Sequence, residues 1–181
     1  MRRLFLQEGN IMKTVRFWMA VMMLGAPLLG LASAAHAKTN DQAAITKLLN
    51  DLGAAVGAKD MDRIMSFYVP DESLFVFDSI PPRQYVGAKA WRKDFEGFFA
   101  EYPGPIKFEV SDLSVTTDGQ LAFAHYVAHM TGAAKEGTKA EMTFRLTDCL
   151  KKIKGKWLIV HEHGSFPVDL ATGKADLLSK P

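Results

Sequence analysis

The second half of the chain consists of four long segments rich in strand-forming residues, separated by short turns that each contain a glycine. A charged residue precedes the glycine in every one of these turns, a pair that is common in β-hairpins. The segments cover 106–117, 120–133, 139–152 and 156–166. This pattern predicts a four-stranded antiparallel meander, and the elements that precede it must then pack against the resulting sheet.

Three helical patterns come before the meander, and each repeats apolar residues at three- and four-residue spacing. They cover 41–56, 60–69 and 88–101. Asn40 or Asp41 is expected to cap the first helix, and two short strands, 74–78 and 84–86, lie between the last two. The order predicts the α+β class, with three N-terminal helices packed on a curved antiparallel or mixed sheet. Such a sheet forms a cone that is filled at its narrow end and leaves a cavity at its mouth.

The first 37 residues differ in character from the rest. A basic start is followed by the apolar run 17–31 and by Ala35-His36-Ala37, the small-x-small pattern of a cleavage site. This is typical of a signal peptide over 1–37, followed by one domain over 38–181 that is periplasmic or secreted in a bacterium. The alternative is an uncleaved membrane anchor over 17–35, although two glycines and a proline interrupt it.

Composition narrows the choice of partners. The chain of 181 residues has a net charge of +2, and the excess of basic residues lies in the first 37. The remaining domain is close to neutral, so nucleic acid is not an expected partner, and no membrane contact is expected after cleavage. Cys149 is the only cysteine, so an internal disulfide cannot form.

The last predicted strand changes from apolar to polar along one face. Residues two apart in a strand share a face. Strict alternation therefore places the following side chains together: Trp157, Ile159, His161, His163 and Ser165. This predicts a pocket wall that begins as core and ends with groups able to bind a ligand or to catalyse a reaction.

Polar residues on the two preceding strands are expected to point into the same cavity. His125 shares a face with His129, and Arg145 shares one with Thr147. A buried arginine requires an acceptor. That acceptor is a ligand carboxylate, enolate or carbonyl oxygen, or else an internal acid: Glu141, Asp78 or Glu162. Glu162 faces opposite the two histidines of its strand, so an ion pair with a lysine or across a dimer is expected for it.

Asp78 ends the first short strand after three apolar residues. An apolar wall raises the pKa of a carboxyl group and suits it to act as a base. The alternative is that Asp78 only starts the turn that continues to Pro82.

Apolar residues also occupy the opposite face of the last strands, where Leu158, Val160 and Phe166 lie. An antiparallel sheet with one wet face would carry polar residues there. The pattern therefore predicts a homodimer formed through the outer face of the sheet, in preference to long loops that cover it.

A set of shorter motifs accompanies this pattern of elements: Pro82, Tyr85, Gly87, Arg92-Lys93-Asp94, Arg145, Thr147, Gly155-Lys156-Trp157 and His161 to Pro167. Together they resemble the SnoaL-like, ketosteroid-isomerase-related proteins of the nuclear transport factor 2-like superfamily. The motif near the end is also similar to the association domain of calcium/calmodulin-dependent protein kinase II. The resemblance implies the cone fold and a pocket, but its members include isomerases, dehydratases, assembly domains and binding proteins.

The sequence is therefore compatible with three functions. The first is binding of a small, partly apolar organic ligand with a carboxylate or carbonyl group, contacted by Tyr85, Trp91, His125, Arg145, Thr147 and Ser165. The second is an isomerase or dehydratase in which Asp78, His161 or His163 moves a proton next to a carbonyl. The third is a dimeric assembly module with a vestigial pocket.

Metal and cofactor binding are not expected. His161 and His163 could reach one ion together with His125 or Asp78, since histidines two apart on a strand share a face. The proteins that the chain resembles generally work without metal, and no further ligand motif accompanies the pair.

Overall fold

The computed structural model describes residues 27–135 and 137–179. The chain divides into two compact units, Met1–Ala37 and Lys38–Pro181. The first unit is described only from Pro27, where helix α2 (Pro27–Ala58) begins, so the basic start and most of the apolar run of the predicted leader lie outside the described residues. Within the described residues, no helix is both long and apolar enough to cross a membrane.

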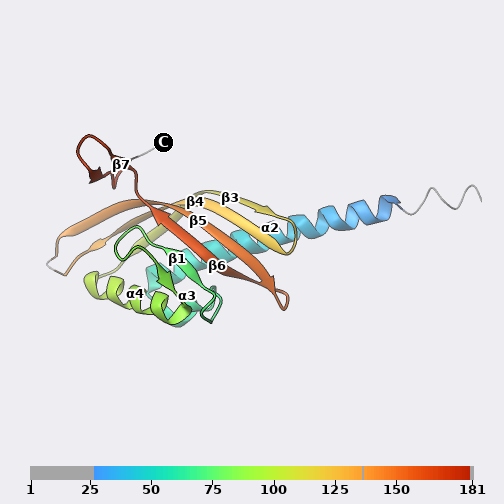
Figure 1. Ribbon diagram of the computed structural model, residues 1–181, viewed down its shortest axis with the longest axis horizontal. Helices are drawn as coiled ribbons and strands as arrows, with labels where there is room; N and C mark the ends of the chain where they lie inside the picture. The colour runs from blue at the N-terminus through green and yellow to red at the C-terminus, as the bar shows by residue number, and fades with distance from the viewer. Residues whose placement is uncertain (1–26, 136, 180–181) are drawn as a thin grey trace, which may run out of the picture. The chain divides into compact units, whose positions relative to one another are not determined.

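The second unit places helices on one face of a six-stranded sheet. Residues 38–58 of α2 are followed by two further helices, α3 (Met61–Met65) and α4 (Ala88–Glu101). The sheet has the order β2-β1-β6-β5-β4-β3, in which β1 runs parallel to β6 and all other neighbours are antiparallel. The bounds are β1 Phe75–Phe77, β2 Tyr85–Val86, β3 Lys107–Thr117, β4 Leu121–Ala133, β5 Lys139–Ile153 and β6 Lys156–Ser165. The predicted α+β class and mixed sheet are confirmed, and Figure 1 shows α3 and α4 on one side of the sheet.

Two predicted helix starts have different outcomes. Asp60 caps α3, because its carboxylate accepts a hydrogen bond from the Arg63 backbone N–H at 3.0 Å. The cap predicted at Asn40 or Asp41 is wrong, since α2 continues through both residues. The Asp41 carboxylate instead accepts hydrogen bonds from Trp157 Nε1 at 3.1 Å and Lys152 Nζ at 2.6 Å, and thereby ties the helix to the sheet.

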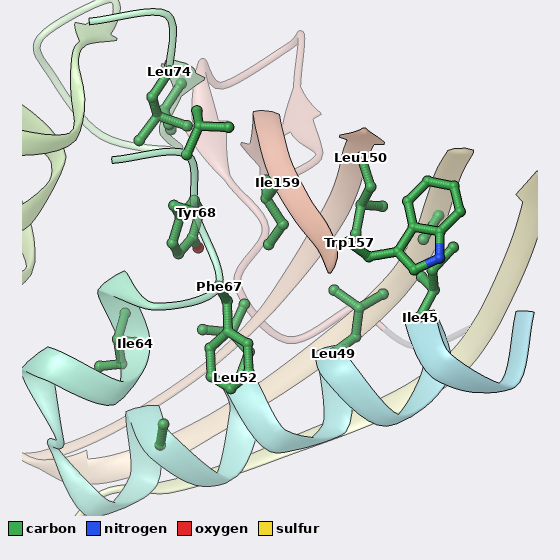
Figure 2. Packing of buried hydrophobic residues seen from close by; sticks show 14 of the residues in the cluster. Ile45, Leu49, Leu52, Ile64, Phe67, Tyr68, Leu74, Leu150, Trp157 and Ile159 are labelled. Carbon is green, nitrogen blue, oxygen red and sulfur yellow. The ribbon is translucent and has the colours of Figure 1, made fainter. Parts of the chain in front are cut away.

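The core fills the space between α2 and the face of the sheet that we call the inner face. Apolar residues on successive turns of α2 meet apolar residues of β5 and β6 (Figure 2). From the helix these are Ile45, Leu49 and Leu52, and from the strands they are Leu150, Trp157 and Ile159. This is the filled end that the sequence predicts for the cone.

The pairing of β5 with β6 contains a bulge that decides which side chains face the core. Leu150 pairs with Ile159, whereas the adjacent Cys149 pairs with His161, so Val160 is an extra residue on β6. Because strand side chains alternate, one extra residue exchanges the two faces beyond it. Ile159 therefore faces inward before the bulge, and Glu162 and Gly164 face inward after it.

The chain continues after β6 into a two-stranded hairpin, formed by β7 (Val168–Asp169) and β8 (Lys174–Ala175). The segment after the hairpin returns to the sheet, where the Thr143 backbone N–H donates to the Leu177 carbonyl at 2.8 Å. This contact brings Leu177 to the open end of the sheet.

Candidate functional site

A cavity of about 640 Å³ lies between the helices and the inner face of the sheet. Its walls are mainly aromatic and aliphatic, and they come from α2, α4, β3, β5 and the segment around Leu177. The apolar and aromatic wall residues include Leu52, Val56, Trp91, Phe95, Phe98, Phe108, Val110, Met142, Phe144, Leu146, Phe166 and Leu177. A cavity of this size and lining suits a small, largely apolar organic molecule.

Tyrosine and carboxyl groups form a buried network at the wall of this cavity. Tyr68 donates its hydroxyl proton to Glu162 Oε2 at 2.6 Å, and Tyr126 donates to Asp148 Oδ2 at 3.0 Å. Tyr68, Tyr126 and Glu162 line the cavity, and Asp148 lies behind them with no exposed surface. A ligand in the cavity can therefore reach Glu162 and both phenols.

The two carboxyl groups are direct neighbours, since Asp148 on β5 pairs with Glu162 on β6 and both face inward. Burial raises the pKa of Glu162 to about 7. Burial and the nearby charge of Glu162 raise the pKa of Asp148 well above its usual value. Glu162 is thus an acid that can hold or release a proton near neutral pH.

Asp78 supplies another carboxyl group to the same cavity, as the sequence predicts. It follows β1, which pairs in parallel with β6, and its Oδ1 lies beside Gly164, 3.7 Å from the position that a Cβ would take there. The Ser79 backbone N–H donates to Asp78 Oδ1 at 2.7 Å, so the residue also makes the predicted turn. Burial raises the pKa of Asp78.

Trp91 lines the cavity, whereas the predicted ligand contact Tyr85 lies behind it. The Tyr85 ring lies 5.5 Å from the Trp91 ring, and its hydroxyl donates to Asp94, which reaches the cavity wall. Four acids but a single base, Lys93, line the cavity within the described part of the chain. The acids are Asp78, Asp94, Glu101 and Glu162. The lining therefore disfavours an anionic ligand.

The prediction that His161, His163 and Ser165 point into the cavity is wrong. These residues follow the bulge at Val160 and lie on the outer face of the sheet. His161 Nδ1 is 2.7 Å from the Phe75 carbonyl oxygen, and the ring packs against Phe75 and Phe77. Strict alternation from Ile159 would have turned all three inward, so one extra residue reversed them.

His125, Arg145 and Thr147 also lie on the outer face, which corrects their predicted position in the cavity. The grouping itself is right, because His125 pairs with Thr147 and Thr147 pairs with His163 across three strands. The error concerns the side of the sheet. The residues of β5 that alternate with Arg145 and Thr147 are apolar, and they, not the polar ones, face the helices. These are Met142, Phe144 and Leu146. Arg145 is exposed and needs no buried acceptor.

The sequence reasoning missed Tyr68, Tyr126 and Asp148, and it assigned Glu162 to the wrong face. A signal existed for two of them. Asp148 interrupts an inward row of apolar residues between Leu146 and Leu150, and Tyr126 is the large residue in a row of alanines on β4. A carboxyl group in an apolar row is costly unless it is hydrogen bonded, so such an interruption is a reason to expect a buried network.

The described residues do not bring metal ligands together. Within residues 27–135 and 137–179, no group of three or more His, Cys, Asp and Glu side chains is arranged to hold a metal ion. The histidines on which a metal site would depend lie on the outer face, away from Asp78.

Comparison with known proteins identifies the family. A SnoaL-like domain model matches residues 45–169, so the chain belongs to the SnoaL-like domain family, within the nuclear transport factor 2-like superfamily. A nuclear transport factor 2-like protein of unknown function from Pseudomonas putida is 29% identical over 79% of this chain and 98% of its own, with a TM-score of 0.71. No functionally curated protein matches the sequence.

More distant structures share the fold alone. One is a Xanthomonas campestris protein provisionally described as a calcium/calmodulin-dependent protein kinase II association domain, with 23% identity, a TM-score of 0.58 and coverage of 67% of this chain and 84% of its own. Another is a Novosphingobium aromaticivorans protein provisionally described as a scytalone dehydratase, with 15% identity, a TM-score of 0.64 and coverage of 81% and 99%. Proteins with quite different provisional descriptions thus share this fold.

Proposed function

We propose that the cavity binds a small, largely apolar molecule with an uncharged carbonyl group and that the protein moves protons next to this carbonyl, as an isomerase or dehydratase does. The observation that carries the proposal is Glu162, a buried acid on the wall of an apolar cavity with a pKa raised to about 7. A general acid works best when its pKa lies near the operating pH. Asp78 on the same cavity wall supplies the second group that such chemistry needs.

In the proposed step, the Asp78 carboxylate removes a proton from the carbon next to the carbonyl. The electron pair of the broken C–H bond forms a C=C bond, and the carbonyl π electrons move to the oxygen, which takes a proton from Glu162. For isomerisation, Asp78 returns its proton to a different carbon while Glu162 recovers the proton of the enol. For dehydration, a hydroxyl group on the β carbon leaves with the Asp78 proton as water, and Glu162 again recovers the enol proton.

Charge favours a carbonyl ligand over a carboxylate. Acids outnumber Lys93 on the cavity lining, and Arg145, the expected anchor for an anion, lies on the outer face. A neutral Glu162 is a donor for an uncharged oxygen, whereas the hydroxyl protons of Tyr68 and Tyr126 are already donated to Glu162 and Asp148. The distant structure that is provisionally described as a dehydratase would belong to the same reaction class, although at 15% identity it supports only the fold.

The test combines binding with isotope exchange. Small cyclic ketones and enones are expected to raise the melting temperature of the wild type, and matched carboxylates are not. In D₂O, the wild type should exchange the α protons of a bound ketone, and Glu162→Gln or Asp78→Asn should slow this exchange by about 10²- to 10⁴-fold. Arg145→Ala is the matched outer-face control and should exchange at the wild-type rate. Preferential binding of carboxylates, or equal exchange in all four proteins, contradicts the proposal.

Binding without catalysis is the second candidate. The hydroxyl groups of Tyr68 and Tyr126 already donate to the two carboxyl groups, an arrangement that also occurs in purely structural networks. Ketones that raise the melting temperature without any α-proton exchange would favour this candidate over the enzyme.

The homodimer remains part of the proposal, although Phe166, one of the residues on which the expectation rested, lines the cavity and not the outer face. Apolar side chains stay exposed on the outer face, where Leu121 is 55% and Phe123 is 46% accessible, and Val86 at the sheet edge is 47% accessible. Phe123→Glu is expected to turn a dimer into a monomer in light scattering. Leu170→Glu is the control, because Leu170 is 95% exposed in the β7–β8 hairpin. A wild type that stays monomeric at high concentration contradicts the dimer.

Export is proposed from the sequence pattern of residues 1–37. Expression of the full chain in a bacterium should yield a periplasmic protein that begins at Lys38, as measured by intact-mass spectrometry. Full-length protein in the membrane fraction would favour the uncleaved anchor.

A further inference from the structure

Asp148 and Glu162 form a pair of acids with little access to water. They lie opposite each other on β5 and β6, and their exposed fractions are 0% and 7%. Asp148 Oδ2 accepts from Tyr126, but Asp148 Oδ1 is buried and has no hydrogen-bond partner among the described residues. An unsatisfied carboxyl oxygen in the interior is costly.

The groups around the pair come from four parts of the fold, and none of these described groups is a cation. They are Tyr68 after α3, Asp78 after β1, Trp91 on α4 and Tyr126 on β4. Two carboxylates that are this deeply buried, with no cation among the described groups around them, repel each other strongly, so both cannot be ionised at neutral pH.

One bound proton would account for both the unbonded oxygen of Asp148 and the close approach of two acids without a cation. Each tyrosine occupies one oxygen of one carboxyl group, which leaves Asp148 Oδ1 and the second oxygen of Glu162. A proton between these two groups satisfies the orphan oxygen and removes the repulsion.

We infer that Asp148 is a positioning residue that keeps one proton on the Asp148–Glu162 pair at neutral pH and thereby holds Glu162 ready to donate a proton into the cavity. The first half of this inference stands on the geometry alone, and the second half rests on the proposed function. Burial raises the pKa of both groups, which agrees with a retained proton.

The variant that tests the pair is Asp148→Asn. It keeps the shape of the side chain, but its amide can donate a hydrogen bond to Glu162 and so favours the carboxylate form. Carboxyl ¹³C NMR of ligand-free protein should show one glutamate that titrates near neutral pH in the wild type. In Asp148→Asn this glutamate should titrate at least one pH unit lower. Thr147→Asn, the next position on the same strand, faces outward and should leave the titration unchanged.

Glu162→Gln is the second variant in case Asp148→Asn does not fold. It should move the titration of Asp148 toward the ordinary carboxyl range for the same reason. A wild-type Glu162 that titrates like a surface glutamate, or a titration that neither variant moves, overturns the inference.

The same proteins separate this inference from the proposed function. If ketone exchange is absent but the pair titrates as expected, the proposed function fails and the shared proton stands. If the wild type exchanges ketone protons and Asp148→Asn keeps the same pH profile of exchange, the proposed function stands and the role of Asp148 is refuted. A pH profile that moves with the titration of Glu162 supports both.

Discussion

The inner and outer faces of the sheet hold their ionisable groups in opposite ways. On the inner face, Asp148 and Glu162 are buried, hydrogen bonded to tyrosines and shifted in pKa by that burial. On the outer face, His125 and Arg145 are exposed beside apolar side chains such as Phe123. The inner acids are therefore linked to folding and to the cavity, whereas the outer groups are free to meet another surface.

The difference shows where a polar residue carries information about function. A buried acid lowers stability unless specific partners satisfy it, so its presence calls for a reason that packing does not provide. An exposed histidine or arginine on a sheet costs little, and its presence alone does not indicate a ligand.

The largest expected contrast between the faces is in stability. Ile159→Ala removes a fully buried side chain and should lower the free energy of unfolding by about 2–5 kcal/mol. Leu121→Ala, on the outer face, should change it by less than about 0.5 kcal/mol in the monomer. Urea unfolding measures both variants. A loss at Leu121 that grows with protein concentration would instead show that the outer face is buried between subunits.

An intermediate effect is expected where α2 is tied to the inner face. Asp41→Ala leaves Trp157 Nε1 without its acceptor and should cost about 1–3 kcal/mol of unfolding free energy at pH 7. The hydrogen bond from Lys152 lowers the pKa of Asp41 below its usual value. The stabilisation is therefore present above the unfolded-state pKa of about 4 and is lost as the pH falls through the folded-state value.

Urea unfolding of wild type and Asp41→Ala should accordingly converge at acid pH. Asp51→Asn is the control on the exposed side of the helix, where Asp51 pairs with Lys47 and Arg63, and it should have the smaller effect. An Asp41 variant with the same deficit at every pH would show that the loss comes from packing and not from the charge.

The smallest expected effect is that of a substitution on the outer face on ligand binding. Arg145→Ala should leave a ketone-induced rise in melting temperature unchanged, and Leu146→Asn, one residue further along β5, should reduce it because Leu146 lines the cavity. Differential scanning fluorimetry measures the rise. If Arg145→Ala abolished it while Leu146→Asn did not, the assignment of the two faces would have to be reversed.

Much of the fold could be predicted because hydrophobic spacing and turn residues are local properties of the sequence. The four long strands, the aromatic helix 88–101 and the start of α3 at Asp60 all follow from such signals. The early start of α2 could not be predicted from Asn40 and Asp41, because residues that cap helices also occur within them.

The site was harder to predict because it depends on which face the helices cover. Alternation in β4 and β5 grouped His125 with Thr147, but it did not say which side of the sheet meets the helices. Asp78 and Trp91 were found, since each follows or belongs to an apolar element beside the cavity. Glu162 was misplaced because the bulge at Val160 leaves no clear mark in the sequence.

The extra residue at Val160 determines which side chains of β6 after it point into the cavity. One inserted or deleted codon at this point would trade a carboxyl group for imidazoles on the inner wall, while the hydrogen-bonded ladder on either side could persist. Proteins with this fold could therefore acquire a different set of reactive groups through a single insertion or deletion, while the rest of the sheet keeps its structure.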